Sequence, residues 1–81
     1  MPTFLDVRSY ITFKEGKPYH VHQADETATT RYYGYCNIDG SWIVMQQNTT
    51  TGAHRYIFGK SDFPTNWTGR TGLTYDYVYN L

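Results

Sequence analysis

The chain has 81 residues, a formal net charge of zero at pH 7 and 19% aromatic residues, with nine tyrosines among them. This length holds one small domain, residues 1–81, whose stability depends on a dense aromatic core or on burial against other subunits. The zero net charge excludes electrostatic steering toward polyanions, so we expect no nucleic-acid partner. Cys36 is the only cysteine, which excludes a disulfide within the chain.

The sequence shows no targeting or membrane segment. Residues 1–6 lack the basic region and the apolar run of a signal peptide. No apolar stretch approaches the roughly 20 residues that a membrane-spanning helix needs. A lone cysteine also fits a reducing compartment. We therefore expect a soluble protein that is made in the cytoplasm and has no membrane partner.

The N-terminal part is predicted to hold an extended arm, residues 1–6, followed by a β-hairpin. The first strand of the hairpin, residues 7–13, alternates imperfectly between apolar and polar residues, and residues 18–22 resume the extended pattern after a polar turn. Pro18 has no backbone donor, so this second strand is predicted to be short or to lie at a sheet edge.

No part of the sequence shows the apolar spacing of a long amphipathic helix. Residues 23–30 are compatible with one helical turn capped by Asp25 or with a polar connection. The sequence therefore predicts an all-β fold: a small antiparallel sheet, a sandwich or a partly open barrel, built from β-hairpins.

The centre of the predicted fold is residues 31–58, where two aromatic and β-branched runs flank Asp39 and Gly40. Asp-Gly is typical of a type I′ hairpin turn, which needs a positive φ at both central residues. A polar cluster at residues 48–52 indicates a second reversal before residues 53–59. The pattern predicts a three-stranded antiparallel meander.

The two-residue period of a strand separates the side chains of this meander into two faces, both of them substantially apolar. On the first strand, one face carries Tyr32, Gly34, Cys36 and Ile38, and the other carries Tyr33, Tyr35 and Asn37. On the second strand, Trp42, Val44 and Gln46 lie opposite Ile43, Met45 and Gln47. We therefore predict a cover on each face, one from the N-terminal hairpin and one from a neighbouring subunit. The residues expected in the core or an interface are Trp42, Met45, Tyr56 and Phe58.

After the meander, residues 60–72 are predicted to form a long aromatic loop that contains Phe63 and Trp67. A loop of this length is uncommon unless it packs on its own side chains or binds something. Residues 73–79 alternate cleanly, with tyrosines on one side. They predict a C-terminal strand that docks in the chain's own sheet or in a partner's.

Two histidines, His20 and His22, share one face of a predicted strand, and this spacing can serve a metal ion. Asp25, Glu26 or His54 could complete such a site. Exposed edge-strand histidines are the favoured interpretation, because a closed site needs three or four fixed ligands. We expect no metal and no cofactor.

A catalytic role finds little support in the sequence. Cys36 lies in the middle of a predicted strand, without a neighbouring base that would lower its pKa, and is better explained as a small core thiol. The acidic residues lie mostly in turns and form no recognisable acid/base pair. Asn48 is explained by its turn, where its side chain can bond the backbone locally. We predict that the protein is not an enzyme.

Aromatic rings can also stack on sugars, which makes Trp42 and Trp67 candidates for glycan binding. Packing is favoured for Trp42, while packing and ligand binding are equally compatible with Trp67.

A set of aromatic and turn residues over about residues 31–79 resembles small, uncharacterised structural proteins of the virions of tailed bacteriophages. The pattern reads Tyr32-Tyr33-Gly34-Tyr35, Asp39-Gly40-x-Trp42-x-Val44-Met45, Arg55-Tyr56, Asp62-Phe63-x-x-Asn66-Trp67-Thr68-x-Arg70 and Leu73-Thr74-Tyr75-Asp76-Tyr77. The resemblance implies a small β protein in or on the virion, made in the cytoplasm of the bacterial host. It brings no catalytic or ligand-binding residue with it.

We therefore expect a non-enzymatic virion component that assembles in several copies, in the tail, the neck or a head-surface fibre or decoration. Its expected partners are further copies of itself and other virion proteins. The residues expected at subunit contacts or at a ligand are Phe63, Trp67, Arg70, Tyr75, Tyr77 and Tyr79. The alternative is a carbohydrate- or receptor-binding module that uses the aromatic loop, and a third hypothesis is a small inhibitor of a host protein.

Overall fold

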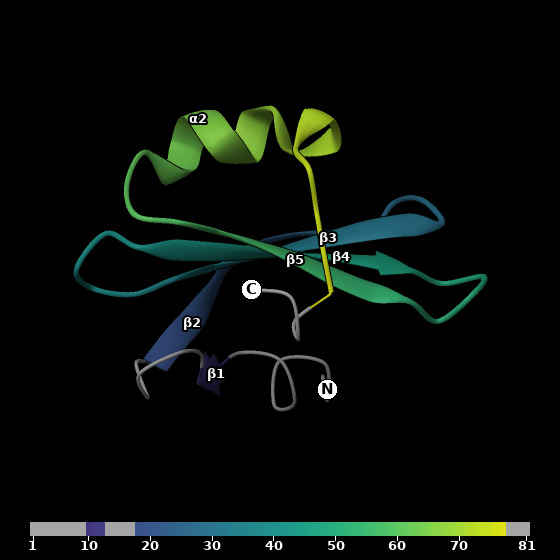
Figure 1. Ribbon diagram of the computed structural model, residues 1–81, viewed down its shortest axis with the longest axis horizontal. Helices are drawn as coiled ribbons and strands as arrows, with labels where there is room; N and C mark the ends of the chain where they lie inside the picture. The colour runs from purple at the N-terminus through teal and green to yellow at the C-terminus, as the bar shows by residue number, and fades with distance from the viewer. Residues whose placement is uncertain (1–9, 13–17, 78–81) are drawn as a thin grey trace.

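The computed structural model describes residues 10–12 and 18–77, and the predicted arm (residues 1–6) and Tyr79 lie outside this part. Five strands form one antiparallel sheet in the order β1-β2-β3-β4-β5, so each strand pairs with its neighbour in the chain (Figure 1). The strands are β1 (Tyr10–Thr12), β2 (Pro18–Asp25), β3 (Thr30–Cys36), β4 (Trp42–Asn48) and β5 (His54–Gly59). A short helix, α2 (Phe63–Thr68), and a 3₁₀ turn, η2 (Arg70–Gly72), follow. The prediction of a small antiparallel sheet built from hairpins is confirmed, in the form of an open sheet.

Strand β2 differs from its prediction, because it is eight residues long and lies between β1 and β3. Pro18 is its first residue and pairs with Thr12, a position at which a missing donor is tolerated. The strand continues to Asp25. It therefore includes the first part of residues 23–30, for which the sequence allowed either a helical turn or a polar connection. A bulge between Val21 and Gln23 shifts its register against β3.

The turn between β3 and β4 lies at Asp39 and Gly40 as predicted, but its type is different. The Asn37 N–H donates to Ser41 O at 2.9 Å, and the Gly40 N–H donates to Asn37 O at 3.0 Å. Gly40 has a φ of 95°, whereas Asp39 is not among the residues with positive φ, so the type I′ prediction is wrong. This is a three-residue hairpin loop that ends in a left-handed glycine. Asn37 Oδ1 accepts the Asp39 N–H and Asp39 Oδ1 accepts the Ser41 N–H, and these local bonds stabilise the observed form.

The second reversal is confirmed between β4 and β5. Asn48 Oδ1 accepts the N–H groups of Thr50 and Thr51 at 2.9 and 3.2 Å, as expected for its turn role. Gly52 supplies the left-handed residue, with a φ of 79°.

The predicted separation of the two faces of the sheet is also confirmed. We call the side covered by α2 the helix face (Figure 1); its buried cluster is Tyr32, Trp42, Val44, Phe63 and Trp67. The other side, which we call the opposite face, buries Tyr19, Tyr33, Tyr35, Ile43 and Met45. Trp42 and Met45 are therefore core residues of the chain itself, and Tyr56 and Phe58 pack against the opposite-face cluster.

The sheet curls toward its opposite face. The rings of Tyr19 on β2 and Phe58 on β5 meet edge to face, with centroids 6.4 Å apart. These strands are three spacings apart in the sheet order, roughly 14 Å in a flat sheet. Figure 1 shows β1 and the start of β2 bending away from β3–β5 on the side opposite to α2. Strand β1 and the start of β2 thus lie on the side of the opposite face. The helix face is covered by α2 of the same chain and not by the predicted neighbouring subunit.

The segment after β5 corrects two predictions. Residues 60–72 are not an irregular loop, because they contain α2 and η2. Helix α2 has only six residues, begins after Asp62 with its φ of 66°, and places Pro64 in its first turn, where a missing donor is tolerated. Residues 73–77 do not form the predicted strand: within the described chain they make a single bridge, between Asp76 and Tyr56, and residues 78–79 lie outside it.

Candidate functional site

Helix α2 rests on the sheet through two aromatic rings, Phe63 and Trp67, which stack with centroids 5.8 Å apart. They are spaced i, i+4 and so share one side of the helix. The sheet accommodates them at Gly34, where an added Cβ would lie 2.6 Å from the Phe63 ring and 3.0 Å from the Trp67 ring. Trp42 fixes the chain just before the helix, because its Nε1–H donates to Ser61 O at 2.7 Å.

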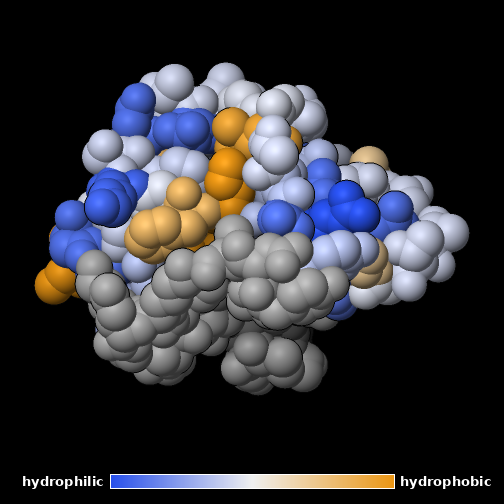
Figure 2. Space-filling view, viewed as in Figure 1, coloured by the Kyte–Doolittle hydropathy of each residue, from blue (hydrophilic) through white to orange (hydrophobic). Residues whose placement is uncertain are grey.

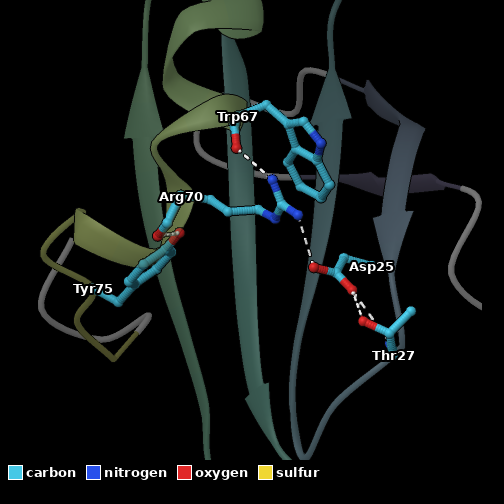
Figure 3. A network of polar contacts seen from close by, with 5 residues as sticks. All are labelled: Asp25, Thr27, Trp67, Arg70 and Tyr75. Atoms are coloured by element: carbon cyan, nitrogen blue, oxygen red, sulfur yellow. Dashed lines mark hydrogen bonds and ion pairs between the residues drawn. The ribbon is translucent and has the colours of Figure 1, made fainter.

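A polar network joins the end of α2 to β2, and Arg70 is at its centre (Figure 3). Its Nη2 donates to Asp25 Oδ2 at 2.8 Å, and its Nη1 donates to Trp67 O at 2.9 Å. The guanidinium carbon also lies 4.5 Å from the centroid of the Trp67 ring, a cation–π distance. The arginine thus holds the C-terminal end of the helix on the sheet.

Asp25 is held in its ionised form by this network. Its other carboxylate oxygen accepts the backbone N–H and the hydroxyl of Thr27, at 3.2 and 2.7 Å. The hydrogen bond from Arg70, followed by those from Thr27, lowers the pKa of Asp25 to about 2. The Asp25 carboxylate is therefore ionised at neutral pH, and its role in this network is structural.

Residues 73–77, which we call the C-terminal segment, run from η2 across the sheet to β5 (Figure 1). The Tyr75 hydroxyl donates to Arg70 O at 2.7 Å, and its ring lies 6.0 Å from that of Tyr32. Burial, assisted by Tyr32, raises the pKa of Tyr75, so its hydroxyl stays protonated and keeps donating.

The end of the C-terminal segment is attached to the edge of β5. Asp76 and Tyr56 exchange both backbone hydrogen bonds, at 2.7 and 3.0 Å. Beside them, Arg55 Nη2 donates to the Tyr77 hydroxyl at 3.2 Å, and its guanidinium lies 4.9 Å from the Tyr77 ring centroid. Backbone pairing and one arginine–tyrosine contact thus fix this end.

The structure brings together most of the residues that the sequence proposed as contact residues. Phe63, Trp67, Arg70 and Tyr75 meet at the helix face, while Tyr77 lies at β5. Phe63 is 6% and Trp67 is 8% exposed, so both rings belong to the chain's own core. Trp42, the other candidate for sugar stacking, is 3% exposed.

The residues proposed for metal binding do not come together. In residues 10–12 and 18–77, no three side chains of the His, Cys, Asp or Glu type are placed to hold a metal ion. His22 lies at the bulge of β2 and packs edge to face on Phe63, with centroids 5.4 Å apart. Asp25, the nearest candidate acid in sequence, is paired with Arg70 instead.

Cys36 is half-buried at the end of β3 and packs against the helix-face cluster. Burial raises the pKa of its thiol. The thiol is therefore less nucleophilic at neutral pH than an exposed one.

A second polar group lies on the opposite face, where Arg31, Gln47 and His54 are direct cross-strand neighbours on β3, β4 and β5. Arg31 Nε and Gln47 Oε1 are buried and have no hydrogen-bond partner. Because both atoms are shielded from solvent, a ligand reaches them only after the side chains shift.

Two features were missed by the sequence reasoning. The pairing of Asp25 with Arg70 joins residues 45 positions apart, for which no local pattern gives a signal. Ile38 is 99% exposed at the tip of the β3–β4 hairpin. Recognition of the three-residue loop would have placed Ile38 in the turn instead of on a sheet face.

Among the described residues, no helix has the length and apolar character needed to cross a membrane. Comparison of the chain with protein-family models, with curated proteins and with solved structures found no match.

Proposed function

We propose that this protein is a non-enzymatic structural subunit of a tailed-phage particle, which assembles with copies of itself and with other virion proteins. One observation carries the proposal. The residues on which the resemblance to virion proteins depends, among them Tyr32, Trp42, Phe63, Trp67 and Arg70, build the helix-face cluster and its polar network. This placement supports a scaffold role for the pattern.

The state of the ionisable groups supports the non-enzymatic part of the proposal. Asp25 is a paired carboxylate, and burial raises the pKa values of Cys36 and Tyr75. None of these three groups has the activation that a nucleophile or a general base needs near pH 7.

The surface supports strand addition as the mode of assembly. In the coloured part of Figure 2, apolar residues reach the surface in a narrow strip below the helix, and hydrophilic residues border it. On the face that Figure 2 shows, a strip of this width offers little area for a face-to-face contact. Backbone pairing at a sheet edge needs less apolar area, and in this chain Asp76 already pairs in this way with β5.

Two measurements test the proposal. We expect peptides of the protein in particles purified from infected cells that express it, and a defined multimer by light scattering over a concentration series. A monomer at all concentrations, together with absence from the particles, would contradict the proposal and favour an inhibitor of a host protein.

The burial of Phe63 and Trp67 weighs against the alternative of a glycan- or receptor-binding module. A sugar that stacked on either ring would have to displace α2 from the sheet. We expect tryptophan fluorescence to stay unchanged across a glycan panel, and a saturable change would reinstate this alternative.

A further inference from the structure

Three polar side chains occupy one end of the opposite face, next to the turns that follow β2 and β4 (Figure 1). Arg31 on β3 pairs with Gln47 on β4, and Gln47 pairs with His54 on β5. Directly paired residues have Cβ atoms about 4.5–5.5 Å apart, so their side chains are within reach of one another. We call these three residues the polar trio. The aromatic and aliphatic residues of the opposite-face cluster lie further along the same strands.

The polar trio contains a donor and an acceptor without partners. Arg31 Nε and Gln47 Oε1 are buried and form no hydrogen bond, either with each other or with another group. Folded proteins satisfy nearly all buried polar atoms, because an unpaired one loses its bonds to water without a replacement. A donor and an acceptor on neighbouring strands therefore indicate that a group from outside the chain pairs with both.

The charge of Arg31 is also unpaired. Within the described part of the chain its guanidinium forms no ion pair, whereas Arg70, another half-buried arginine, is paired with Asp25. Glu26, in the connection between β2 and β3, accepts the Tyr33 hydroxyl at 2.7 Å. A partly buried guanidinium without a counter-charge favours an anion, and its planar fork of donors fits a carboxylate.

A ligand can reach the polar trio from solvent. Arg31 and Gln47 are half-buried and His54 is exposed, so the trio borders solvent although two of its atoms are shielded. Nε is the innermost of the three guanidinium nitrogens, and the two outer ones extend beyond it. An anion therefore meets the outer nitrogens first. Rotation of the Arg31 and Gln47 side chains then brings Nε and Oε1 to the ligand.

We propose that the polar trio binds a carboxylate with an amide N–H close to it, as in an N-acyl amino acid or at the C-terminal end of a polypeptide. The carboxylate accepts hydrogen bonds from the Arg31 guanidinium, the amide N–H donates to Gln47 Oε1, and His54 borders the ligand. Such a ligand supplies both the missing counter-charge and the missing donor. This inference goes beyond the proposed function, because binding of the ligand requires no multimer.

The Arg31 Nε–H signal in proton–nitrogen NMR spectra of the full chain reports binding directly. We expect N-acetylglycine to shift this signal in a saturable way, because the compound holds both the carboxylate and the N–H. N-acetylglycinamide lacks the carboxylate and acetate lacks the N–H, so both are expected to bind at least about tenfold more weakly. Equal affinities for the three compounds, or no saturable shift with N-acetylglycine, would overturn the proposal.

Arg31→Lys tests the role of the guanidinium, because it keeps the positive charge and removes the planar fork of donors. We expect N-acetylglycine to bind this variant at least about tenfold more weakly, as followed by the backbone signals of Gln47 and His54. Arg55→Lys makes the same change on the other side of β5 and is the matched control. It should bind the compound as the wild type does.

Gln47→Glu gives a second test, which stays valid if Arg31→Lys does not fold. The substitution places a carboxylate beside Arg31 within the chain, so we expect this internal anion to occupy the guanidinium and to exclude N-acetylglycine. Gln46→Glu, the same substitution on the helix face, is the control and should leave binding unchanged. Unimpaired binding to Gln47→Glu would contradict the proposal.

The length of the ligand distinguishes its two sources. N-acetyl-triglycine ends in the same carboxylate and N–H but continues as a polypeptide. Tighter binding than that of N-acetylglycine would assign the site to the end of a polypeptide, and equal or weaker binding would assign it to a small N-acyl amino acid. Failure of all these compounds to bind would overturn this inference and leave the proposed function standing, since assembly is measured separately by light scattering.

Discussion

Among single residues, Arg70 makes three different kinds of contact. It forms an ion pair with Asp25, donates to the carbonyl of Trp67 and lies over the indole ring. An arginine can do this because its guanidinium is planar and carries several donors, whereas lysine offers a single point charge. The network therefore depends on this residue type as well as on its charge.

The pH dependence of stability follows from the lowered pKa of Asp25. Its folded-state pKa is about 2, against an ordinary value of 3.8, so the unfolded chain binds more protons between these values. The stabilisation is complete above about pH 4, and it is lost as the pH falls toward 2. We expect urea unfolding to show that the wild type has a larger free energy of unfolding than Asp25→Asn above about pH 4. This difference in free energy should shrink as the pH falls toward 2. Asp62→Asn, which changes an exposed carboxyl outside the network, serves as the control.

Gly34 gives the second prediction at this scale. Gly34→Ala would drive a methyl group into the rings of Phe63 and Trp67, so we expect a loss of about 1–3 kcal/mol in the free energy of unfolding. Gly72→Ala, with no atom near its added methyl group, should leave stability almost unchanged. Equal effects of the two substitutions in denaturant titrations would disprove the close packing of α2 on β3.

At the scale of elements, the β3–β4 hairpin shows how local side chains select a turn. The Asp-Gly pair indicates the correct place, but Asn37 and Asp39 bond backbone groups on either side of the turn and favour a three-residue loop. Only Gly40 then needs a left-handed backbone.

Gly40→Ala is therefore expected to cost about 1–2 kcal/mol of stability, because an L-residue is strained at a φ of 95°. The measurement is the midpoint of chemical unfolding, with Gly72→Ala again as the control. A neutral result at position 40 would mean that the loop has another conformation.

Helix α2 marks the limit of what periodicity can predict. Six residues with two apolar members give less than two turns of pattern, so the segment resembles a loop in sequence. Residues 73–77 show the opposite error, because a segment that looks like a paired strand in sequence forms only one bridge in the described chain. Leu73 and Tyr75 alternate with polar residues because they pack on the helix-face cluster, and an extended chain over a core produces alternation without a ladder of hydrogen bonds. The meander and its two faces were predictable, since strand period and turn residues are local signals.

On the scale of the whole molecule, the described residues bury large aromatic side chains in both cores, and among them Ile38, at a hairpin tip, is the one large apolar side chain that is exposed. Ile38→Ser is expected to change the free energy of unfolding by less than about 0.5 kcal/mol, because the side chain is 99% exposed. Ile43→Ala, at a fully buried position, should cost about 2–5 kcal/mol. A large loss of stability for Ile38→Ser in denaturant titrations would show that the tip is covered in solution.

The pairing of every strand with its neighbour in the chain also has a consequence for folding kinetics. In the described sheet each strand pairs with its neighbour in the chain, so the sheet contacts span shorter separations than those of sheets with crossover connections, and a lower contact order favours faster folding. The ion pair between Asp25 and Arg70 closes a separation of 45 residues, so we expect it to form late. During synthesis, the strands are complete before α2 leaves the ribosome, and Trp42 and Val44 then lack their cover. The nascent sheet is thus most prone to aggregation until the last quarter of the chain arrives.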